Sequence, residues 1–346
     1  MAEVGNLSLK EHLMGCFMEK EKGGFPFCEV NFPQLYLETE KYLNKKLHPQ
    51  VVSGAAANGS GYLTDHGPRH VGMVIQRASL LLGKNISRLS GYETFLLLLA
   101  IHFHDVGNAL GRETHERQIA KVMTECKLSS DIDTAVRRLI VKIAAAHGGK
   151  TDDGSKDTIG EIEPEVFING VQVRPALLAA ILRFADELAD DHTRTNELMN
   201  NINAIPEENR IYHLYSSCLQ PVGISGRSIN FQFDLNRSDV CKTFLKDNEE
   251  CYLYDEVLMR MKKCYCELLY CSRYAEGLLN FSAINVSISV FDDNTGFTCL
   301  YKDTFSLRIC GYPDDAVAKP ITSILKTGLK CLNGGQLKKM LEREEA

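Results

Sequence analysis

The feature that most constrains the fold is the segment 92–105, which is apolar almost all round the helix that it predicts. A helix without a polar face has to be buried among other elements. This segment ends in HFHDVGN, so the charged side chain of Asp105 stands at the end of the most apolar helix in the chain. A buried charge is costly unless a cation neutralises it. We therefore expect a mainly α domain built round this helix, with polar chemistry at its end.

The residue pair His104–Asp105 restricts where such chemistry can occur. Adjacent side chains on a regular helix point about 100° apart, so the two can share an ion only near a helix terminus, which Gly107 supplies. A second acid, Asp186, lies in the apolar segment ALLAAILRFADELAD. Taken alone, an acid in such a helix is more often structural, either capping the helix or pairing with Arg183.

Composition excludes several classes of protein. A chain of 346 residues with 44% hydrophobic and 24% charged residues is typical of a globular protein and long enough for two domains. A net charge of -6 argues against a protein whose main affinity is for a nucleic-acid backbone. The longest apolar run, Phe95 to Ile101, is far below the roughly 18 residues that cross a bilayer. The N-terminus does not resemble a secretory signal, and the twelve cysteines are irregularly spaced. We therefore expect reduced thiols and a cytoplasmic protein.

The first two thirds of the chain carries apolar residues at helical intervals. The expected helices cover residues 7–20, 33–46, 68–82, 92–105, 112–126, 131–147 and 176–190. Asp131 is the expected N-cap of the sixth helix. The small residues at 53–61 predict a flexible segment, and the polar, glycine-rich stretch 148–165 predicts a loop that is a candidate lid.

The character of the sequence changes from about residue 206. The segments IYHLYSSC and SINFQFDL alternate like strands, 239–277 has a helical pattern, and INVSISVFDD with GFTCLYKDTFSLRIC predicts a hairpin. This indicates a C-terminal α+β accessory domain without a motif that reveals its role. The expected domains are residues 1–50 as packing helices, 51–205 as the central helical domain, and 206–346 as the accessory domain.

The order His70, His104–Asp105, Asp186 resembles the H…HD…D pattern of the HD superfamily of metal-dependent phosphohydrolases. The resemblance covers roughly residues 60–195 and includes YLTDHGPRHVGMV, LAIHFHDVGNA, RETHERQIAKV and LAAILRFADELADDHTR. The sequences of these segments are similar to those of bacterial HD proteins of defence and conflict systems. The resemblance implies an HD-domain helical bundle in which these four residues bind a metal ion.

Further histidines are candidates for the same site. His115 resembles the histidine near the scissile phosphate of nucleotide triphosphohydrolases in this superfamily, and His147 resembles the extra histidines of binuclear members. The alternatives are an exposed His115 and a helix-capping His147. His66 is the rival of His70 as first ligand, or a residue that meets substrate or orients a ligand. We expect His115, His147 and Asp105 to be catalytic. His102, two residues from His104, is expected on another face.

Cations are expected round the negatively charged phosphate. The candidates lie beside the motif residues, and for each of them a solvated position or a surface ion pair is the plain alternative. They are Arg69, Arg77, Arg112, Lys150 and Arg194, with His66 as a further substrate-binding candidate.

Mixed imidazole and carboxylate ligands suit manganese, iron, nickel, cobalt or zinc better than magnesium alone, with one or two ions bound. The resemblance implies hydrolysis of a phosphoester in a nucleotide by metal-activated water. Deoxynucleoside triphosphate hydrolysis is the first expectation, because of His115. The alternatives are a phosphodiesterase of cyclic nucleotides or signalling dinucleotides, and a nucleotide sensor of a defence system without turnover. The expected partners are the nucleotide, a second copy of the chain in a homo-oligomer, and a protein of a defence operon, with no membrane and no nucleic acid.

Overall fold

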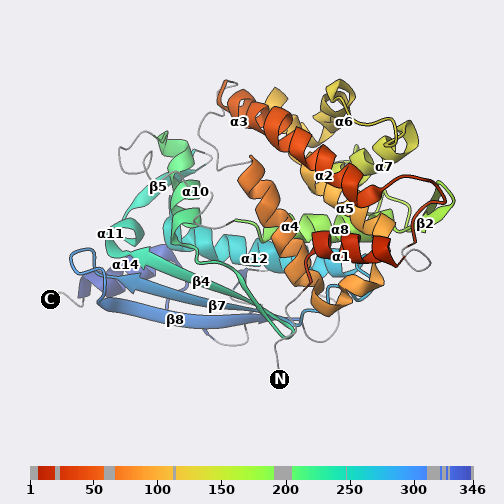
Figure 1. The fold of residues 1–346 in the computed structure, drawn as a ribbon. Coiled ribbons are helices and arrows are strands. Elements are labelled where there is room, and N and C mark those ends of the chain that lie inside the picture. Colours follow the sequence, from red (N-terminus) through yellow and green to blue (C-terminus); the bar gives the residue numbers. More distant parts are fainter. Residues whose placement is uncertain are drawn as a thin grey trace. The chain divides into compact units, whose positions relative to one another are not determined.

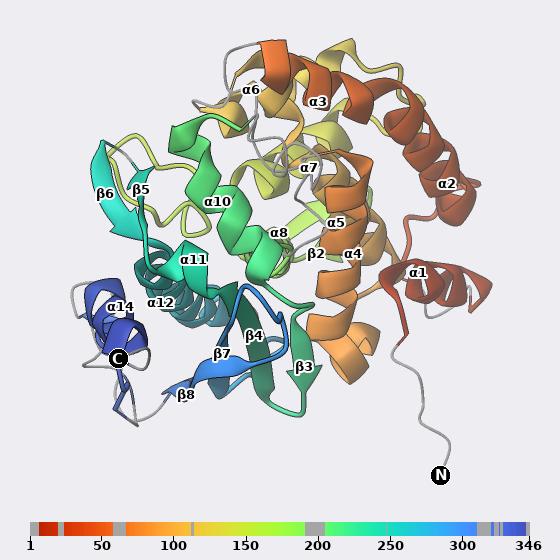
Figure 2. The same cartoon turned by 90° about the vertical axis from the view of Figure 1, so that its left-hand side faces the viewer.

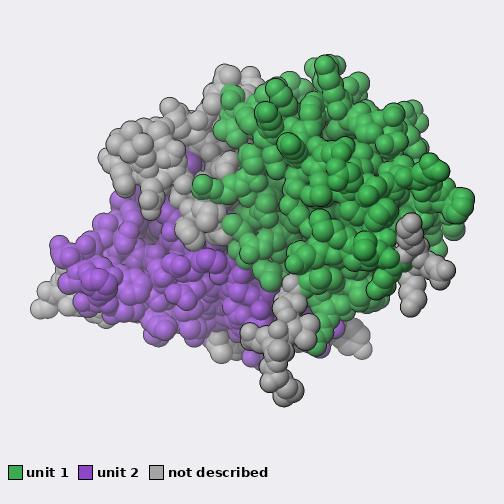
Figure 3. Space-filling view, viewed as in Figure 1, with its two compact units in different colours: residues 1–189, 271–279 green, residues 190–270, 280–346 purple. Residues whose placement is uncertain are grey.

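The computed structural model describes residues 7–19, 24–57, 67–111, 114–190, 205–246, 248–309, 320–321, 325 and 328–343, without the side chains of 54–57 and 208. The chain divides into two compact units, shown in Figure 3. Unit 1 comprises residues 1–189 and 271–279, and unit 2 comprises residues 190–270 and 280–346. The sequence-based domain boundaries at residues 50 and 205 remain a prediction.

Unit 1 is mainly helical, as the sequence predicts (Figures 1 and 2). Its elements are α1 (Leu9–Met18), α2 (Phe32–Tyr42), the π-helical turn η1 (Leu43–Leu47), α3 (His48–Ala57), α4 (Pro68–Leu82), the 3₁₀ turn η2 (Gly83–Arg88), α5 (Gly91–Phe103), the 3₁₀ turn η3 (Val106–Leu110), α6 (His115–Glu125), α7 (Thr134–Ala145), the strands β1 (Val166–Ile168) and β2 (Val171–Val173), and α8 (Pro175–Glu187).

Helix α5 is the centre of unit 1. Every one of its residues is buried, and it packs against α1, α2, α4, α7 and α8. Its start is fixed by a capping box, in which Ser90 accepts from the backbone N–H of Glu93 and the Glu93 carboxylate accepts from the backbone N–H of Ser90. The prediction of a buried central helix is confirmed.

Helices α5 and α8 are joined at their beginnings by a buried ion pair. Arg174, the N-cap of α8, donates from Nε and Nη2 to the two carboxylate oxygens of Glu93, each at 2.8 Å. Glu93 is 3% exposed, and its charge raises the pKa of Arg174 above the usual value. A bidentate pair of this kind fixes geometry as well as charge. It therefore aligns the two helices that carry His104, Asp105 and Asp186.

Two local predictions for unit 1 are wrong and one is confirmed. Residues 53–57 are part of α3, because the small residues there include three alanines, which favour helix. The N-cap of α7 is Asp133, which accepts from the N–H of Val136, and not Asp131. The predicted loop at 148–165 is confirmed, and its second half is held by contacts, since Ile159 is 0% exposed and Tyr274 donates to Asp157 at 2.6 Å. Its role as a lid remains a prediction.

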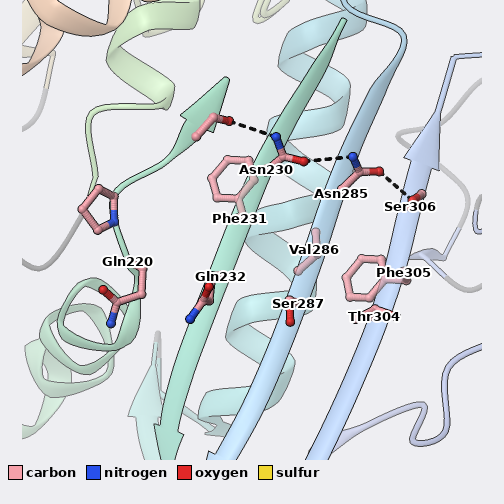
Figure 4. A pocket seen from close by; sticks show the side chains of 12 residues that line it. Gln220, Asn230, Phe231, Gln232, Asn285, Val286, Ser287, Thr304, Phe305 and Ser306 are labelled. Carbon is pink, nitrogen blue, oxygen red and sulfur yellow. Dashed lines mark hydrogen bonds between the residues drawn. The ribbon is translucent and has the colours of Figure 1, made fainter. Parts of the chain in front are cut away.

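Unit 2 is α+β, as predicted. It contains a four-stranded sheet in the order β3–β4–β7–β8, in which β4 and β7 are parallel and the other pairs antiparallel. Helix α12 lies along one face of this sheet (Figures 1 and 4). The elements are α10 (Glu207–Cys218), β3 (Gly223–Ser225), β4 (Ser228–Asn236), α11 (Arg237–Val240), the paired strands β5 (Thr243–Lys246) and β6 (Glu249–Tyr252), α12 (Leu253–Ser272), β7 (Ala283–Phe291), β8 (Cys299–Arg308) and α14 (Gly334–Arg343).

The other face of the sheet is polar, and the part of it that lines a groove is uncharged. A shallow groove of about 530 Å³ runs over it, and Figure 4 shows the side chains that line it. Across the four strands, Ser306 donates to Asn285 at 2.7 Å, Asn285 donates to Asn230 at 3.0 Å, and Asn230 donates to the carbonyl of Gly223 at 3.5 Å. These bonds satisfy the amide groups among themselves.

Two predictions for unit 2 are wrong, while the strand SINFQFDL and the hairpin are confirmed. The segment IYHLYSSC forms α10 instead of a strand, because Ile211, Tyr215 and Cys218 recur at helical intervals and are the residues that become buried. The helical pattern of 239–277 is interrupted by β5 and β6 before α12 begins. The hairpin of β7 and β8 is confirmed.

Among the described residues, no single helix is long and apolar enough to cross a membrane. The segments Gly91–Leu110 and His115–Glu125 meet the criteria only as a pair bent by 102°.

Candidate metal centre

The HD pair lies where α5 ends, which is the geometry that two adjacent ligands require. His104 keeps helical dihedral angles as the C-cap of α5. Asp105 leaves the helix with φ -104° and ψ 1° and begins the 3₁₀ turn η3. His104 is 0% exposed and Asp105 is 7% exposed, so both side chains lie inside unit 1.

A first cluster contains the four residues of the H…HD…D pattern. The Nε2 atom of His70, on the first turn of α4, lies 3.3 Å from Nε2 of His104 and 3.1 Å from Oδ1 of Asp186. The Oδ2 atom of Asp105 lies 3.4 Å from Nε2 of His70 and 3.3 Å from Nε2 of His104. Three segments that are distant in sequence, α4, the end of α5 and α8, therefore bring two imidazole nitrogens and two carboxylate oxygens to one point.

A second cluster lies on the other oxygen of Asp105. Oδ1 of Asp105 lies 3.4 Å from Nε2 of His115 and 3.7 Å from Nε2 of His147, and these two nitrogens are 3.2 Å apart. Ligand atoms in each group, His70 with His104 and Asp186, and Asp105 with His115 and His147, lie within 4.8 Å of one another. Asp105 thus faces the first cluster with Oδ2 and the second with Oδ1.

Backbone carbonyls orient two of the rings. Nδ1 of His104 lies 2.7 Å from the carbonyl oxygen of Ile101, and Nδ1 of His147 lies 2.7 Å from that of Ala144. A carbonyl oxygen only accepts, so Nδ1 carries the hydrogen in both rings. The lone pair of Nε2 is then directed into the cluster, as in a metal-binding histidine.

The close approach of η3 and α6 depends on Gly107. A Cβ at position 107 would lie 2.7 Å from the carbonyl carbon of His115. His115 follows Thr114, whose positive φ of 56° is unusual for a β-branched residue and turns the chain into α6. Gly107 therefore does more than end the helix, because it also lets His115 reach Asp105.

Charge in the clusters is balanced in a way that fits a cation. Burial disfavours protonation of His104, but the carboxylates of Asp105 and Asp186 outweigh this and raise its pKa well above the usual value. Burial disfavours ionisation of Asp186, but its bonds to His104 and His70 hold its pKa well below the usual value. Burial and the neighbouring charge of His104 lower the pKa of His147 to about 4. Asp186 is thus ionised and the imidazole of His147 is neutral, which are the forms that bind metals. The raised pKa of His104 reflects the negative charge of the two neighbouring carboxylates, which a bound cation would neutralise in place of the proton.

The donor set and its orientation fit divalent cations. The structure brings together all four residues predicted as ligands and adds both His115 and His147 to them. Arg183, the alternative partner of Asp186, donates to Oγ1 of Thr158 at 2.9 Å. The buried His and Asp groups can therefore hold a metal ion, with nitrogen and oxygen ligands that suit a transition metal.

The other predicted residues are distributed differently. Arg69 and Lys150 are exposed, Arg69 beside His70 and Lys150 after α7, while Arg77 is buried in α4. His66, Arg112 and Arg194 lie outside the described residues. His102 faces away from the clusters, as expected, and its Nδ1 lies 3.1 Å from Nε2 of buried His48.

Two side chains beside the clusters escaped the sequence analysis. Asn108 donates to Oδ1 of Asp105 at 3.0 Å, and Oε2 of Glu116 lies 3.3 Å from Nδ1 of His115. The signal for both was their closeness in sequence to a motif histidine or aspartate. It was not decisive, because the direction of their side chains depends on the turns at η3 and α6.

The helical unit with its His/Asp cluster defines an HD-type domain of the kind found in metal-dependent hydrolases. The HD-CE family model matches residues 60–243, more than half of the chain, and the chain belongs to this family. No curated protein matches the sequence.

Proposed function

We propose that this protein is a metal-dependent phosphohydrolase that acts on nucleotides. The observation that carries the proposal is that the two carboxylate oxygens of Asp105 face two separate groups of ligands. A carboxylate shared in this way is suited to two neighbouring cations. Paired cations stabilise both the attacking and the leaving oxygen of a displacement at phosphorus.

The residues of the chain have distinct parts in this reaction. Bound cations would neutralise the phosphate and lower the pKa of a water molecule that attacks phosphorus. Asp105 fixes the positions of the two cation sites relative to each other. The buried imidazoles of His70 and His104 exclude water from the interior side of the first site. The side chains of Asp186 and His115 are 25% and 20% exposed, so the substrate approaches from their side. Exposed Lys150 and Arg69 attract its negative charge.

The choice of nucleotide depends on His115. A histidine that stands free beside the scissile phosphate favours deoxynucleoside triphosphate hydrolysis. In this chain Nε2 of His115 lies 3.2 Å from Nε2 of His147, which is the position of a ligand. This arrangement favours a two-cation site, and such sites also hydrolyse phosphodiesters. Cyclic nucleotides and signalling dinucleotides therefore stand beside deoxynucleoside triphosphates as proposed substrates.

The experiment that tests the proposal is a hydrolysis screen with Mn²⁺. Deoxynucleoside triphosphates, cyclic nucleotides and cyclic dinucleotides are incubated with wild type and with Asp105→Ala, and products are separated by ion-exchange chromatography. The expected result is hydrolysis of one class by wild type only. Release of triphosphate or of a nucleoside monophosphate distinguishes the two reactions. Activity that survives Asp105→Ala refutes the assignment of the site.

The second candidate is a nucleotide sensor of a defence system that has no turnover. It shares the cation site, so it predicts nucleotide binding by wild type with Mn²⁺ and no product after prolonged incubation. The completeness of both ligand groups favours the enzyme, since turnover requires every one of these side chains and simple binding does not.

A further inference from the structure

Glu116, the second residue of α6, touches the segments that carry both histidines of the second cluster. Its Oε2 lies 3.3 Å from Nδ1 of His115. Gly149, two residues after His147, packs so closely on the same carboxylate that a Cβ at position 149 would overlap Oε1 and Cδ of Glu116. The Glu116 side chain is only 13% exposed. One carboxylate therefore lies between the start of α6 and the turn that follows α7.

This contact gives His115 a different partner from the other oriented rings. His104 and His147 donate their Nδ1 hydrogens to backbone carbonyls. With the hydrogen of His115 on Nδ1, the ring presents that hydrogen to the Glu116 carboxylate 3.3 Å away, and the lone pair of Nε2 faces Oδ1 of Asp105 and Nε2 of His147. A carboxylate in this position fixes the ring and makes the imidazole a stronger ligand.

A plainer role for Glu116 is a favourable interaction with the N-terminus of α6. An acid in the first turn of a helix stabilises it by about 0.3–1 kcal/mol. That role predicts an effect on folding and none on a cation. It also gives no reason for Gly149, with φ of 72°, to pack directly on the carboxylate.

We propose that Glu116 is a positioning residue that sets the affinity of the second cation site through His115, and that Gly149 holds its carboxylate in place. The inference rests on the proposed function only in that the second cluster binds a divalent cation. It assigns different determinants to the two sites, because the first cluster has no contact with Glu116 among the interactions of the described residues.

The test is a calorimetric titration of the metal-free full-length chain with Mn²⁺. Wild type is expected to bind two ions. In Glu116→Ala the second ion is expected to bind about 10–100-fold more weakly, which is the usual cost of removing a partner of a ligating histidine, with the first ion unchanged. Glu116→Gln keeps an oxygen that accepts from Nδ1, so it is expected to restore part of the affinity.

A second variant displaces the Glu116 carboxylate without changing residue 116 itself. Gly149→Ala would displace the end of the Glu116 side chain and is expected to weaken the same ion. Gly154→Ala is its matched control, because Gly154 lies in the same loop with a positive φ of 85° and has open space where its Cβ would stand. Both changes strain the backbone, and only Gly149→Ala disturbs Glu116.

The outcomes separate this inference from the proposed function. Two ions in wild type and an unchanged second affinity in Glu116→Ala overturn the inference and leave the site intact. Equal weakening of both ions, or equal effects of Gly149→Ala and Gly154→Ala, also overturns it, since the effect is then on folding. A wild-type chain that binds fewer than two ions refutes the two-cation site and the inference with it.

Discussion

Gly107→Ala tests whether the second cluster depends on the close approach of η3 and α6. The new Cβ would lie 2.7 Å from the carbonyl carbon of His115, while carbon atoms in contact lie about 3.5–4.0 Å apart. The same Cβ would overlap the carbonyl oxygen of His115, so the start of α6 must move by more than about 1 Å. Metal–ligand distances tolerate about 0.2 Å, so His115 leaves the second cluster while His70, His104 and Asp186 keep their places.

The expected result is a chain that folds, loses about 1–3 kcal/mol of stability to overpacking, and binds one Mn²⁺ instead of two. Unfolding in urea gives the first quantity and elemental analysis after dialysis gives the second. Gly72→Ala is the control, because Gly72 lies in α4 two residues after His70 with open space for a Cβ. It is expected to bind two ions. Two ions bound with wild-type affinity in Gly107→Ala would refute the reasoning.

Three further predictions concern the separate parts of unit 1. His147→Ala removes a ligand of the second cluster only, so elemental analysis is expected to find one ion per chain, and loss of both would contradict the division at Asp105. Glu93→Gln removes the buried carboxylate from Arg174, which keeps its pair with Glu276, and is expected to cost about 1.5–3 kcal/mol of unfolding free energy in urea. A loss below 1 kcal/mol would show that the pair is not structural. Burial and the charge of His102 lower the pKa of His48 to about 3 in the folded chain. Since the unfolded state then binds more protons below its pKa of about 6.5, stability falls as pH falls, by about 2 kcal/mol from this group at pH 5. His48→Gln is expected to remove that part of the difference between metal-free unfolding at pH 7 and pH 5, and an unchanged difference would contradict it.

The sequence predicted the centre of unit 1 because burial leaves a strong pattern there. Helix α5 is apolar on all sides, so it had to lie in the core, and the charged pair at its end had to be explained. The resemblance of His70, His104–Asp105 and Asp186 to the H…HD…D pattern then implied their convergence. Such patterns predict the structure correctly because local propensity and tertiary packing favour the same conformation.

The failures have a local cause. In IYHLYSSC the apolar residues satisfy both an alternating pattern and a helical one, and short runs of this length do not distinguish the two. The contacts of Glu116 with His115 and of Asn108 with Asp105 depend on the turns at η3 and α6, and turns are the part of a structure that sequence patterns predict least well. The approach of Gly107 to His115 is a contact between two backbones, so no side-chain pattern records it.

Anomalous X-ray diffraction from crystals of the Mn²⁺-loaded chain tests the central claim most directly. The account predicts two peaks about 3.5–4 Å apart, one bonded to Oδ2 of Asp105 with His70, His104 and Asp186, and the other bonded to Oδ1 with His115 and His147. A single peak that leaves His115 and His147 unbound, or a peak away from Asp105, would contradict it.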